Sequence, residues 1–130
     1  MSELRFRNTP AANALDYLSH GVSDGRYAFL SGQLAADKTG GARGLGDIEA
    51  ETRIVMELLG GALAEFGLGY GDLVRTNIYM TDLRELDRMN EVYRGFFGSA
   101  PTPARTCVQV AGLIGGGKIE IDGIARLRDR

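Results

Sequence analysis

The chain has 130 residues, 44% of them hydrophobic and 25% charged, a balance typical of a single globular domain, which we place at residues 1–130. The formal net charge of −2 argues against a nucleic-acid partner, because nucleic-acid binders usually carry a basic surface. One cysteine excludes an internal disulfide and one histidine excludes a histidine-rich metal site, so we expect no metal and a cytoplasmic setting. The N-terminal residues contain no long apolar run, and we expect neither a signal peptide nor a membrane anchor.

Two β-strands are predicted near the start of the chain. The first is short, from Leu4 to Arg7. The second, from Arg26 to Ala35, is rich in aromatic and aliphatic residues and follows the turn signal Ser23-Asp24-Gly25. The segment from Asp37 to Gly46 is predicted as a polar, glycine-rich loop that matches no phosphate-binding motif.

Two helices are predicted in the middle of the chain. Asp47 is a typical N-cap, and a helix of roughly 20 residues follows and ends at Gly67. Its predicted apolar face consists of Ile54, Leu58, Leu59, Ala62, Leu63 and Phe66. We expect close packing on a sheet to compensate for the Gly60-Gly61 pair inside it. Asp82 caps a second helix running to about Phe97, with Leu86, Met89, Tyr93 and Phe96 or Phe97 on its buried stripe.

The remaining strands carry polar and apolar residues in alternation. In the strand from Leu73 to Met80, the expected buried set is Val74, Thr76, Ile78 and Met80. The stretch from Thr102 to Arg126 is predicted as two strands joined by a glycine-rich turn. On one face we place Val108, Val110, Ile119 and Ile121, and on the other Arg105, Cys107 and Gln109 together with Glu120 and Asp122. A face that carries an arginine, a thiol and carboxylates is either solvent-facing surface or one wall of a polar site.

The element order β-β-α-β-α-β-β predicts an α+β fold, a single mixed sheet with two helices on one face. The other face then has no helix to cover it. Sheets with one wet face are common, so simple exposure is one interpretation. The alternative is that a second subunit covers this face and leaves a cleft lined by its polar groups.

Several segments have the order, spacing and residues of the sequence motifs of one known family. They are SGQ at Ser31–Gln33, RTNIYMTDL at Arg75–Leu83, MNEVYRGFF at Met89–Phe97, PARTCVQVAGL at Pro103–Leu113 and KIEIDGIA at Lys118–Ala125. Together they cover nearly the whole chain, and it resembles the RidA (YjgF-type) family of reactive-intermediate imine deaminases. The resemblance implies a chorismate-mutase-like fold and a homotrimer with active clefts between neighbouring subunits.

The resemblance also implies a reaction. Such proteins hydrolyse 2-imino or enamine acids, of the 2-iminobutanoate and 2-iminopropanoate type, to 2-oxo acids and ammonia without a cofactor. By match of motif, Arg105 would bind the substrate carboxylate and Glu120 would position or activate water. Backbone groups near Cys107 and Gly32 would help to hold the substrate. The resemblance also places Tyr17, Ser31 and Asn90 at the pocket.

Each of these residues has a structural interpretation as well. Arg105 could form a strand salt bridge, even with Glu120, and Cys107 could be a small packing residue. His20 is expected in a loop or at a strand end, Asn90 could bridge locally, and Tyr93 is expected in the core. Two other function classes remain open: an endoribonuclease or translation inhibitor, and a non-enzymatic ligand-binding trimer. The deaminase interpretation requires the Arg105 and Glu120 head groups to converge on one hollow at a subunit boundary.

Overall fold

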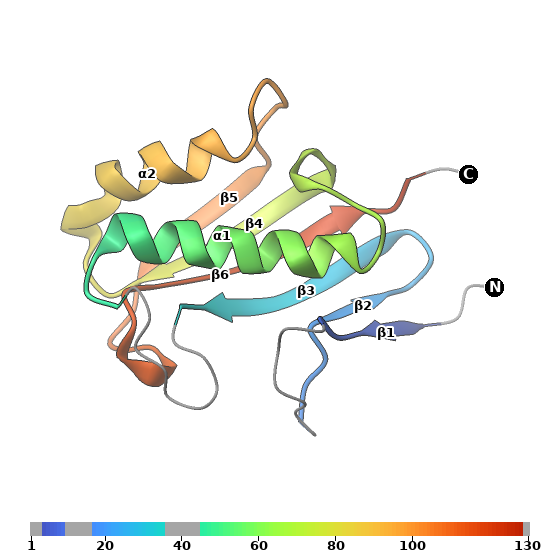
Figure 1. Ribbon diagram of the computed structural model, residues 1–130, viewed down its shortest axis with the longest axis horizontal. Helices are drawn as coiled ribbons and strands as arrows, with labels where there is room; N and C mark the ends of the chain where they lie inside the picture. The colour runs from blue at the N-terminus through green and yellow to red at the C-terminus, as the bar shows by residue number, and fades with distance from the viewer. Residues whose placement is uncertain (1–3, 10–16, 36–44, 129–130) are drawn as a thin grey trace.

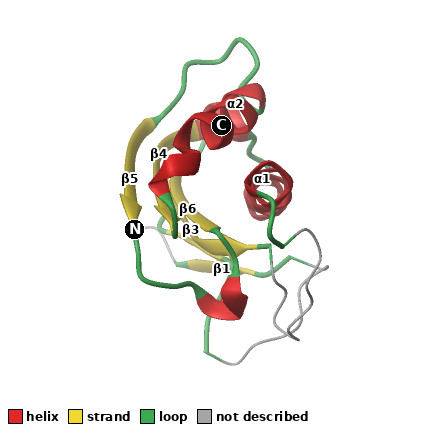
Figure 2. Cartoon of the chain, turned by 90° about the vertical axis from the view of Figure 1, so that its left-hand side faces the viewer, coloured by secondary structure: helices red, strands yellow, loops and turns green. Residues whose placement is uncertain are grey.

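The structure is a computed structural model that describes residues 4–9, 17–35 and 45–128. A six-stranded mixed sheet curves around two helices on one face, as Figures 1 and 2 show. The strands are β1 (Arg5–Arg7), β2 (Gly21–Ser23), β3 (Tyr27–Leu34), β4 (Leu73–Met80), β5 (Ala104–Gln109) and β6 (Ile119–Arg126). The helices are α1 (Ile48–Ala64) and α2 (Leu86–Gly95), and single 3-10 turns lie at η1 (Tyr70–Asp72), η2 (Leu83–Glu85) and η3 (Ile114–Gly116). The expected single mixed sheet with two helices is confirmed.

The strand order is β1-β2-β3-β6-β4-β5, and only the β4–β5 pair is parallel. Strand β2, which is three residues long, was not predicted. The two C-terminal strands are not neighbours, since β4 lies between β6 and β5. This arrangement leaves β5 at one edge of the sheet. The expected loop over 37–44 lies outside the described residues.

Helix α1 begins where the sequence predicts. The Asp47 carboxylate accepts the Glu49 amide at 3.3 Å, and Gly67 follows the helix with a φ of 71°. The buried face is rotated from the expected one and consists of Ile48, Glu51, Thr52, Val55, Met56, Leu59, Ala62 and Leu63. The Gly60-Gly61 pair does not face the sheet as expected. A Cβ at Gly60 would instead collide with the Tyr70 hydroxyl, which donates to the Met56 carbonyl at 2.7 Å.

The core lies between the sheet and the two helices. Helix α2 follows η2, which Asp82 caps by accepting the Arg84 amide, and its stripe buries Met89, Tyr93 and Phe97 as predicted. In β4 the buried residue at the start is Leu73 and not Val74, because a bulge between Leu73 and Arg75 shifts the alternation. No helix in the described ranges is long and apolar enough to cross a lipid bilayer.

A buried carboxylate ties α1 to the turn before β6. Glu51 is fully buried, and its two oxygens accept the amides of Gly46 at 2.8 Å and Lys118 at 2.7 Å. A charged acceptor with two backbone donors satisfies groups that burial would otherwise leave unpaired. The contact fixes the backbone two residues before Glu120.

The face of the sheet away from the helices carries apolar and polar side chains. A cross-strand row of Phe6, Val22, Phe29 and Ile124 runs over β1, β2, β3 and β6. Phe6 is 58% exposed and Phe29 is 44% exposed. No helix among the described residues covers this row, and Figure 2 shows both helices on the opposite side.

Candidate functional site

Arg105 lies on the helix-bearing face of β5. It pairs in register with Thr76, which is fully buried under the helices. Its Nη1 donates to Asn90 Oδ1 of α2 at 2.8 Å, and its Cζ lies 5.3 Å from the centre of the Tyr93 ring. The prediction that Arg105 and Cys107 share a face with Glu120 and Asp122 is therefore wrong. Alternation reveals which residues of one strand share a face, but the partner strand decides which face that is.

An open hollow of about 320 Å³ lies next to this guanidinium. Its volume is near the lower end of the size range of small-molecule sites. We call it the arginine pocket, and it is lined by Asn90, Tyr93, Arg94, Thr102, Pro103 and Arg105. Arg94 pairs with the exposed Glu91 at 3.3 Å. Among the described residues, by contrast, no carboxylate forms a salt bridge with Arg105. The pocket therefore offers a cation that forms no salt bridge with a carboxylate in the part of the chain that the structure describes.

Glu120 lies on the other face of the sheet. Its neighbours Ile119 and Ile121 are fully buried under the helices, so alternation points the carboxylate away from them. It pairs with Tyr79 on β4, and a Cβ at Gly32 on β3 would collide with its carboxylate. We call Gly32, Tyr79 and Glu120 the Glu120 cluster. Within one chain, the Glu120 cluster and the arginine pocket do not form one cavity.

Two further polar groups lie beside the Glu120 cluster. Asp122 accepts Asn77 Nδ2 at 2.8 Å and the Tyr79 hydroxyl at 3.1 Å. Burial, followed by the charge of Asp122, raises the pKa of Tyr79 above its ordinary value, so its phenol keeps its proton at neutral pH. This face therefore presents acceptors and neutral donors next to Glu120.

Ser31 connects the Glu120 side of β3 to the segment before β2. Its hydroxyl donates to the Ser19 carbonyl at 2.5 Å, and its amide donates to the His20 carbonyl at 2.9 Å. His20 itself is 5% exposed and accepts the Thr9 amide at Nδ1. Tyr17, two residues before Ser19, is 78% exposed. Of the predicted residues, Gly32 thus lies beside Glu120 and Asn90 contacts Arg105, whereas Ser31 contacts the segment before β2 and Tyr17 is exposed.

Cys107 is half-buried and packs against the core beside Ile78. Burial raises the pKa of its thiol above the ordinary value, and the charge of Arg105 opposes this only in part. At neutral pH the residue is a protonated thiol, which suits packing better than nucleophilic chemistry.

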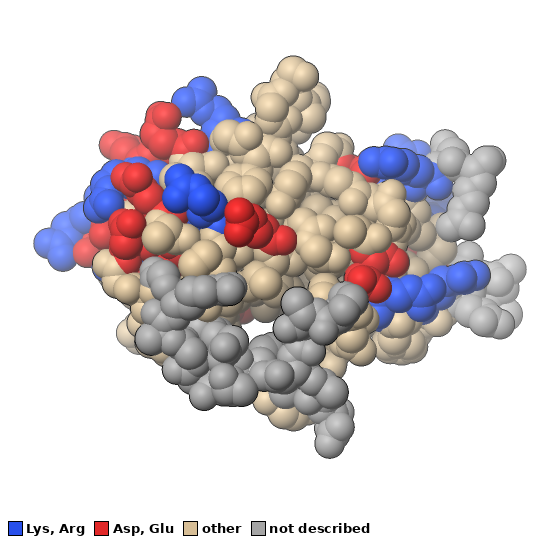
Figure 3. All heavy atoms as spheres, viewed as in Figure 1, with Lys and Arg blue, Asp and Glu red and all other residues tan. Residues whose placement is uncertain are grey.

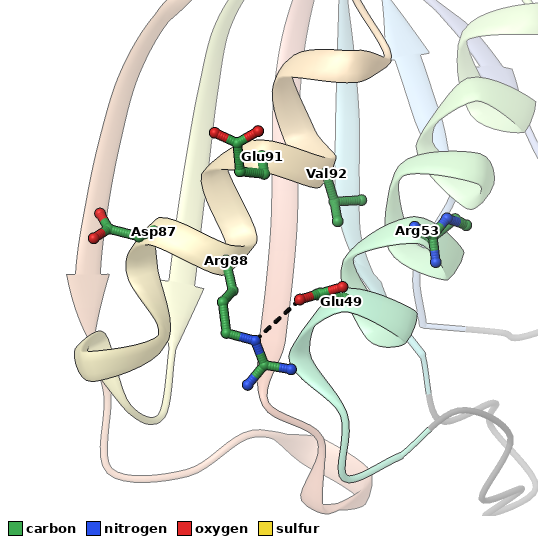
Figure 4. A pocket seen from close by; sticks show the side chains of 6 residues that line it. All are labelled: Glu49, Arg53, Asp87, Arg88, Glu91 and Val92. Atoms are coloured by element: carbon green, nitrogen blue, oxygen red, sulfur yellow. Dashed lines mark hydrogen bonds and ion pairs between the residues drawn. The ribbon is translucent and has the colours of Figure 1, made fainter.

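A second hollow lies on the outer surface between α1 and α2, and Figure 4 shows it. It is lined by Glu49, Arg53, Asp87, Arg88, Glu91 and Val92. Arg88 points to the start of α1 and pairs with Glu49 at 3.0 Å and Asp47 at 3.1 Å. Figure 3 shows basic and acidic groups interspersed at this end of the helix-bearing face. These pairs connect the two helices, and no predicted site residue lines the hollow.

Sequence reasoning missed the floor and rim of the arginine pocket. Tyr93 was expected only in the core, yet its ring contacts Arg105. Thr102 and Pro103 also line the pocket. The signal available was their position just before Arg105, together with the helical spacing that places Tyr93 three residues after Asn90.

The sequence matches the family described as endoribonuclease L-PSP over residues 7–127. The chain belongs to this family, which is the RidA (YjgF-type) family expected from the motifs. Protein DfrA of Myxococcus xanthus is 45% identical over 80% of this chain and 79% of its own length. The 2-iminobutanoate/2-iminopropanoate deaminase of Salmonella typhimurium is 37% identical over 91% of each chain.

Solved structures of the RidA family have the same fold. The crystal structure of Escherichia coli TdcF with bound serine superposes with a TM-score of 0.83 at 32% identity, over 95% of this chain and 98% of that one. A curated relative under the same name is described as a reactive intermediate deaminase and is 35% identical over 88% of this chain and 90% of its own length. These relatives support an enzyme of the reactive-intermediate deaminase type.

Proposed function

We propose that this protein hydrolyses reactive 2-imino acids to 2-oxo acids and ammonia, as a homotrimer whose sites lie between subunits. The observation that carries the proposal is the guanidinium of Arg105, which lines a small open pocket and forms no salt bridge with a described carboxylate, in a chain related to named imine deaminases. A guanidinium and a carboxylate meet through two parallel charge-assisted hydrogen bonds, which fix both position and orientation. Arg105 would hold the substrate carboxylate in this way.

The separation of Arg105 and Glu120 within one chain supports a site shared between two copies. The sheet face that carries Glu120 also carries the apolar row of Phe6, Val22, Phe29 and Ile124, in which both phenylalanines are exposed. Apolar surface of this kind is usually buried by a partner. A neighbouring subunit that covers this face with its β5 edge would bring its own arginine pocket to the Glu120 cluster.

In such a site the chemistry needs one water molecule. Water attacks the imine carbon, and Glu120 orients it and accepts a proton. The resulting carbinolamine then loses ammonia as the carbonyl forms, so that imine and water become 2-oxo acid and ammonia. General-base assistance is typically worth about 10² to 10⁴ in rate. Because a protonated imine is intrinsically electrophilic, a carboxylate clamp and a positioned base are sufficient for the reaction.

A trapping assay tests the proposed function. Threonine dehydratase supplies the imine from threonine, and semicarbazide captures whatever imine remains free. We expect the wild-type protein to lower semicarbazone formation, Arg105→Ala to lose this effect, and Arg53→Ala, on the outer surface of α1, to keep it. Unchanged trapping at micromolar wild-type protein, next to an active relative as control, would contradict the proposal.

RNA cleavage is a second candidate, favoured by the description of the matched family. It predicts that the wild-type protein degrades RNA and that its binding weakens steeply with salt, as phosphate contacts are lost. Intact RNA after incubation with protein that is active in the trapping assay would exclude this candidate. A ligand-binding trimer without enzymatic activity predicts carboxylate binding but no effect on semicarbazide trapping.

A further inference from the structure

We propose that Tyr93 is a positioning residue for Arg105, holding the guanidinium over its ring so that N–H groups not bonded to Asn90 face the arginine pocket. The geometry rests on the contacts of Tyr93 itself. The importance of that geometry for turnover rests on the proposed function, which this inference deepens. Tyr93 would act through Arg105 without contacting the reacting atoms.

A buried hydrogen bond to strand β4 holds the Tyr93 side chain in place. Its hydroxyl lies 2.7 Å from Thr76 Oγ1, and Thr76 is fully buried on β4. Thr76 is also the residue that pairs with Arg105 across the β4–β5 register. Strand β4 therefore holds the hydroxyl end of the Tyr93 ring next to Arg105 on β5.

The Tyr93 ring lies beneath the guanidinium carbon of Arg105. With Arg105 Cζ 5.3 Å from the ring centre, the pair is within the range of cation–π attraction. Burial raises the pKa of the Tyr93 phenol above its ordinary value, so the hydroxyl keeps its proton at neutral pH. A neutral ring orients the cation without neutralising it, which an acidic partner would do.

Asn90 restricts the rotation of the Arg105 guanidinium over the Tyr93 ring. It lies three residues before Tyr93 on α2, and its Oδ1 accepts Arg105 Nη1 at 2.8 Å. The ring contact and the Asn90 hydrogen bond thus hold the guanidinium at two different points. The remaining N–H groups stay available for a carboxylate, and pre-orientation lowers the entropy cost of binding it.

A purely structural role for Tyr93 makes different predictions. Tyr93 is 4% exposed and lies 5.0 Å, ring centre to ring centre, from Phe97. If it only filled the core, Tyr93→Leu and Phe97→Leu would lower stability in similar ways, and neither would act on Arg105. If it positions Arg105, only Tyr93→Leu disturbs the guanidinium, whereas Tyr93→Phe keeps the ring and should largely retain function.

NMR spectroscopy of the arginine side chains tests the positioning directly. The Arg105 Nε–Hε signal is assigned by its absence in Arg105→Lys. We expect a ring-current shift of this signal in the wild type, in Tyr93→Phe and in Phe97→Leu. In folded Tyr93→Leu the signal should remain but the ring-current shift should disappear. An Arg105 signal unchanged in Tyr93→Leu would overturn the inference, whether or not the protein is a deaminase.

Kinetics and ligand binding then connect the positioning to function. We expect Tyr93→Leu to raise KM for the imino acid by roughly 3- to 30-fold with a much smaller change in kcat, because a carboxylate clamp acts on substrate and transition state alike. The affinity for the product 2-oxobutanoate should fall by a similar factor. If 2-oxobutanoate does not bind the wild type while the NMR shift depends on Tyr93, the proposed function fails and the positioning of Arg105 stands. Equal KM values for Tyr93→Leu and Phe97→Leu would contradict a role of Tyr93 in binding.

Discussion

Arg105 and Glu120 lie on opposite faces of the same sheet. Arg105 contacts Asn90 and Tyr93 of α2, whereas Glu120 pairs with Tyr79 on the face that no helix among the described residues covers. A guanidinium clamp and a water-activating carboxylate must meet around one small substrate. Since one chain separates them, the proposed chemistry depends on a second copy of the chain.

Gly32 provides a test of Glu120 that does not substitute Glu120 itself. In Gly32→Ala the new methyl group would occupy the position of the Glu120 carboxylate, which ends a flexible side chain and can move aside. We therefore expect a small change in melting temperature but a fall in kcat of about 10²-fold or more, which is the value of a positioned base. Gly95→Ala is the matched control, because a Cβ there meets nothing within 4 Å. A Gly32→Ala enzyme with wild-type kcat would argue that Glu120 needs no fixed position.

The thiol of Cys107 provides a test that depends on pH. Because burial raises its pKa, the reactive thiolate is scarce at pH 7 and becomes abundant only above the ordinary thiol range. We expect iodoacetamide to alkylate the native protein far more slowly at pH 7 than it alkylates free N-acetylcysteine. Cys107→Ser should retain deaminase activity. Rapid alkylation at pH 7, or abolished activity in folded Cys107→Ser, would point to thiolate chemistry instead.

The adjacent glycines of α1 should respond oppositely to alanine. Gly61→Ala should stabilise the protein by about 0.5–1 kcal/mol, because its Cβ would make only an ordinary contact of 3.9 Å with Thr9 Cγ2 and alanine favours the helix. Gly60→Ala should destabilise it by about 1–3 kcal/mol, since the methyl group displaces the Tyr70 ring and its hydrogen bond to Met56. Urea unfolding measures both changes, and a stabilised Gly60→Ala would show that Tyr70 moves freely.

Glu51 should contribute more to stability than its charge alone would suggest. Glu51→Ala leaves the amides of Gly46 and Lys118 without their acceptor in the interior, at a cost of about 1–3 kcal/mol for each. Glu57→Ala, at an exposed position on the same helix, is the control and should change the free energy of unfolding little. Equal effects of the two substitutions would mean that water replaces the missing carboxylate.

The sequence predicted the long helices and strands better than it predicted which strands pair with each other. Asp47 and Asp82 identified the starts of the two helical segments, because capping is a local interaction that sequence spacing reveals. The face of the sheet on which Arg105 lies could not be predicted in this way. Alternation along β5 is symmetric, and only the parallel pairing with β4 places Arg105 beside the buried Thr76. The family motifs supplied the predicted site residues, but the placement of Arg105 and Glu120 on two faces of the sheet required the structure.

The contacts of Tyr93 show why a helical pattern alone misleads at such positions. A buried aromatic at helical spacing is usually core, and Tyr93 does pack against Phe97. Its second contact, with the Arg105 guanidinium, depends on where the β5 edge lies relative to α2. That relationship joins segments whose pairing no local pattern encodes.

Subunit complementation tests the central claim most directly. Arg105→Ala and Glu120→Ala chains are co-expressed with different tags, and oligomers that contain both are purified through both tags. If each site combines Arg105 of one subunit with Glu120 of its neighbour, every mixed trimer holds one intact site, and its activity should recover to about one third of the wild-type value. Mixed trimers as inactive as either parent would contradict a site shared between subunits.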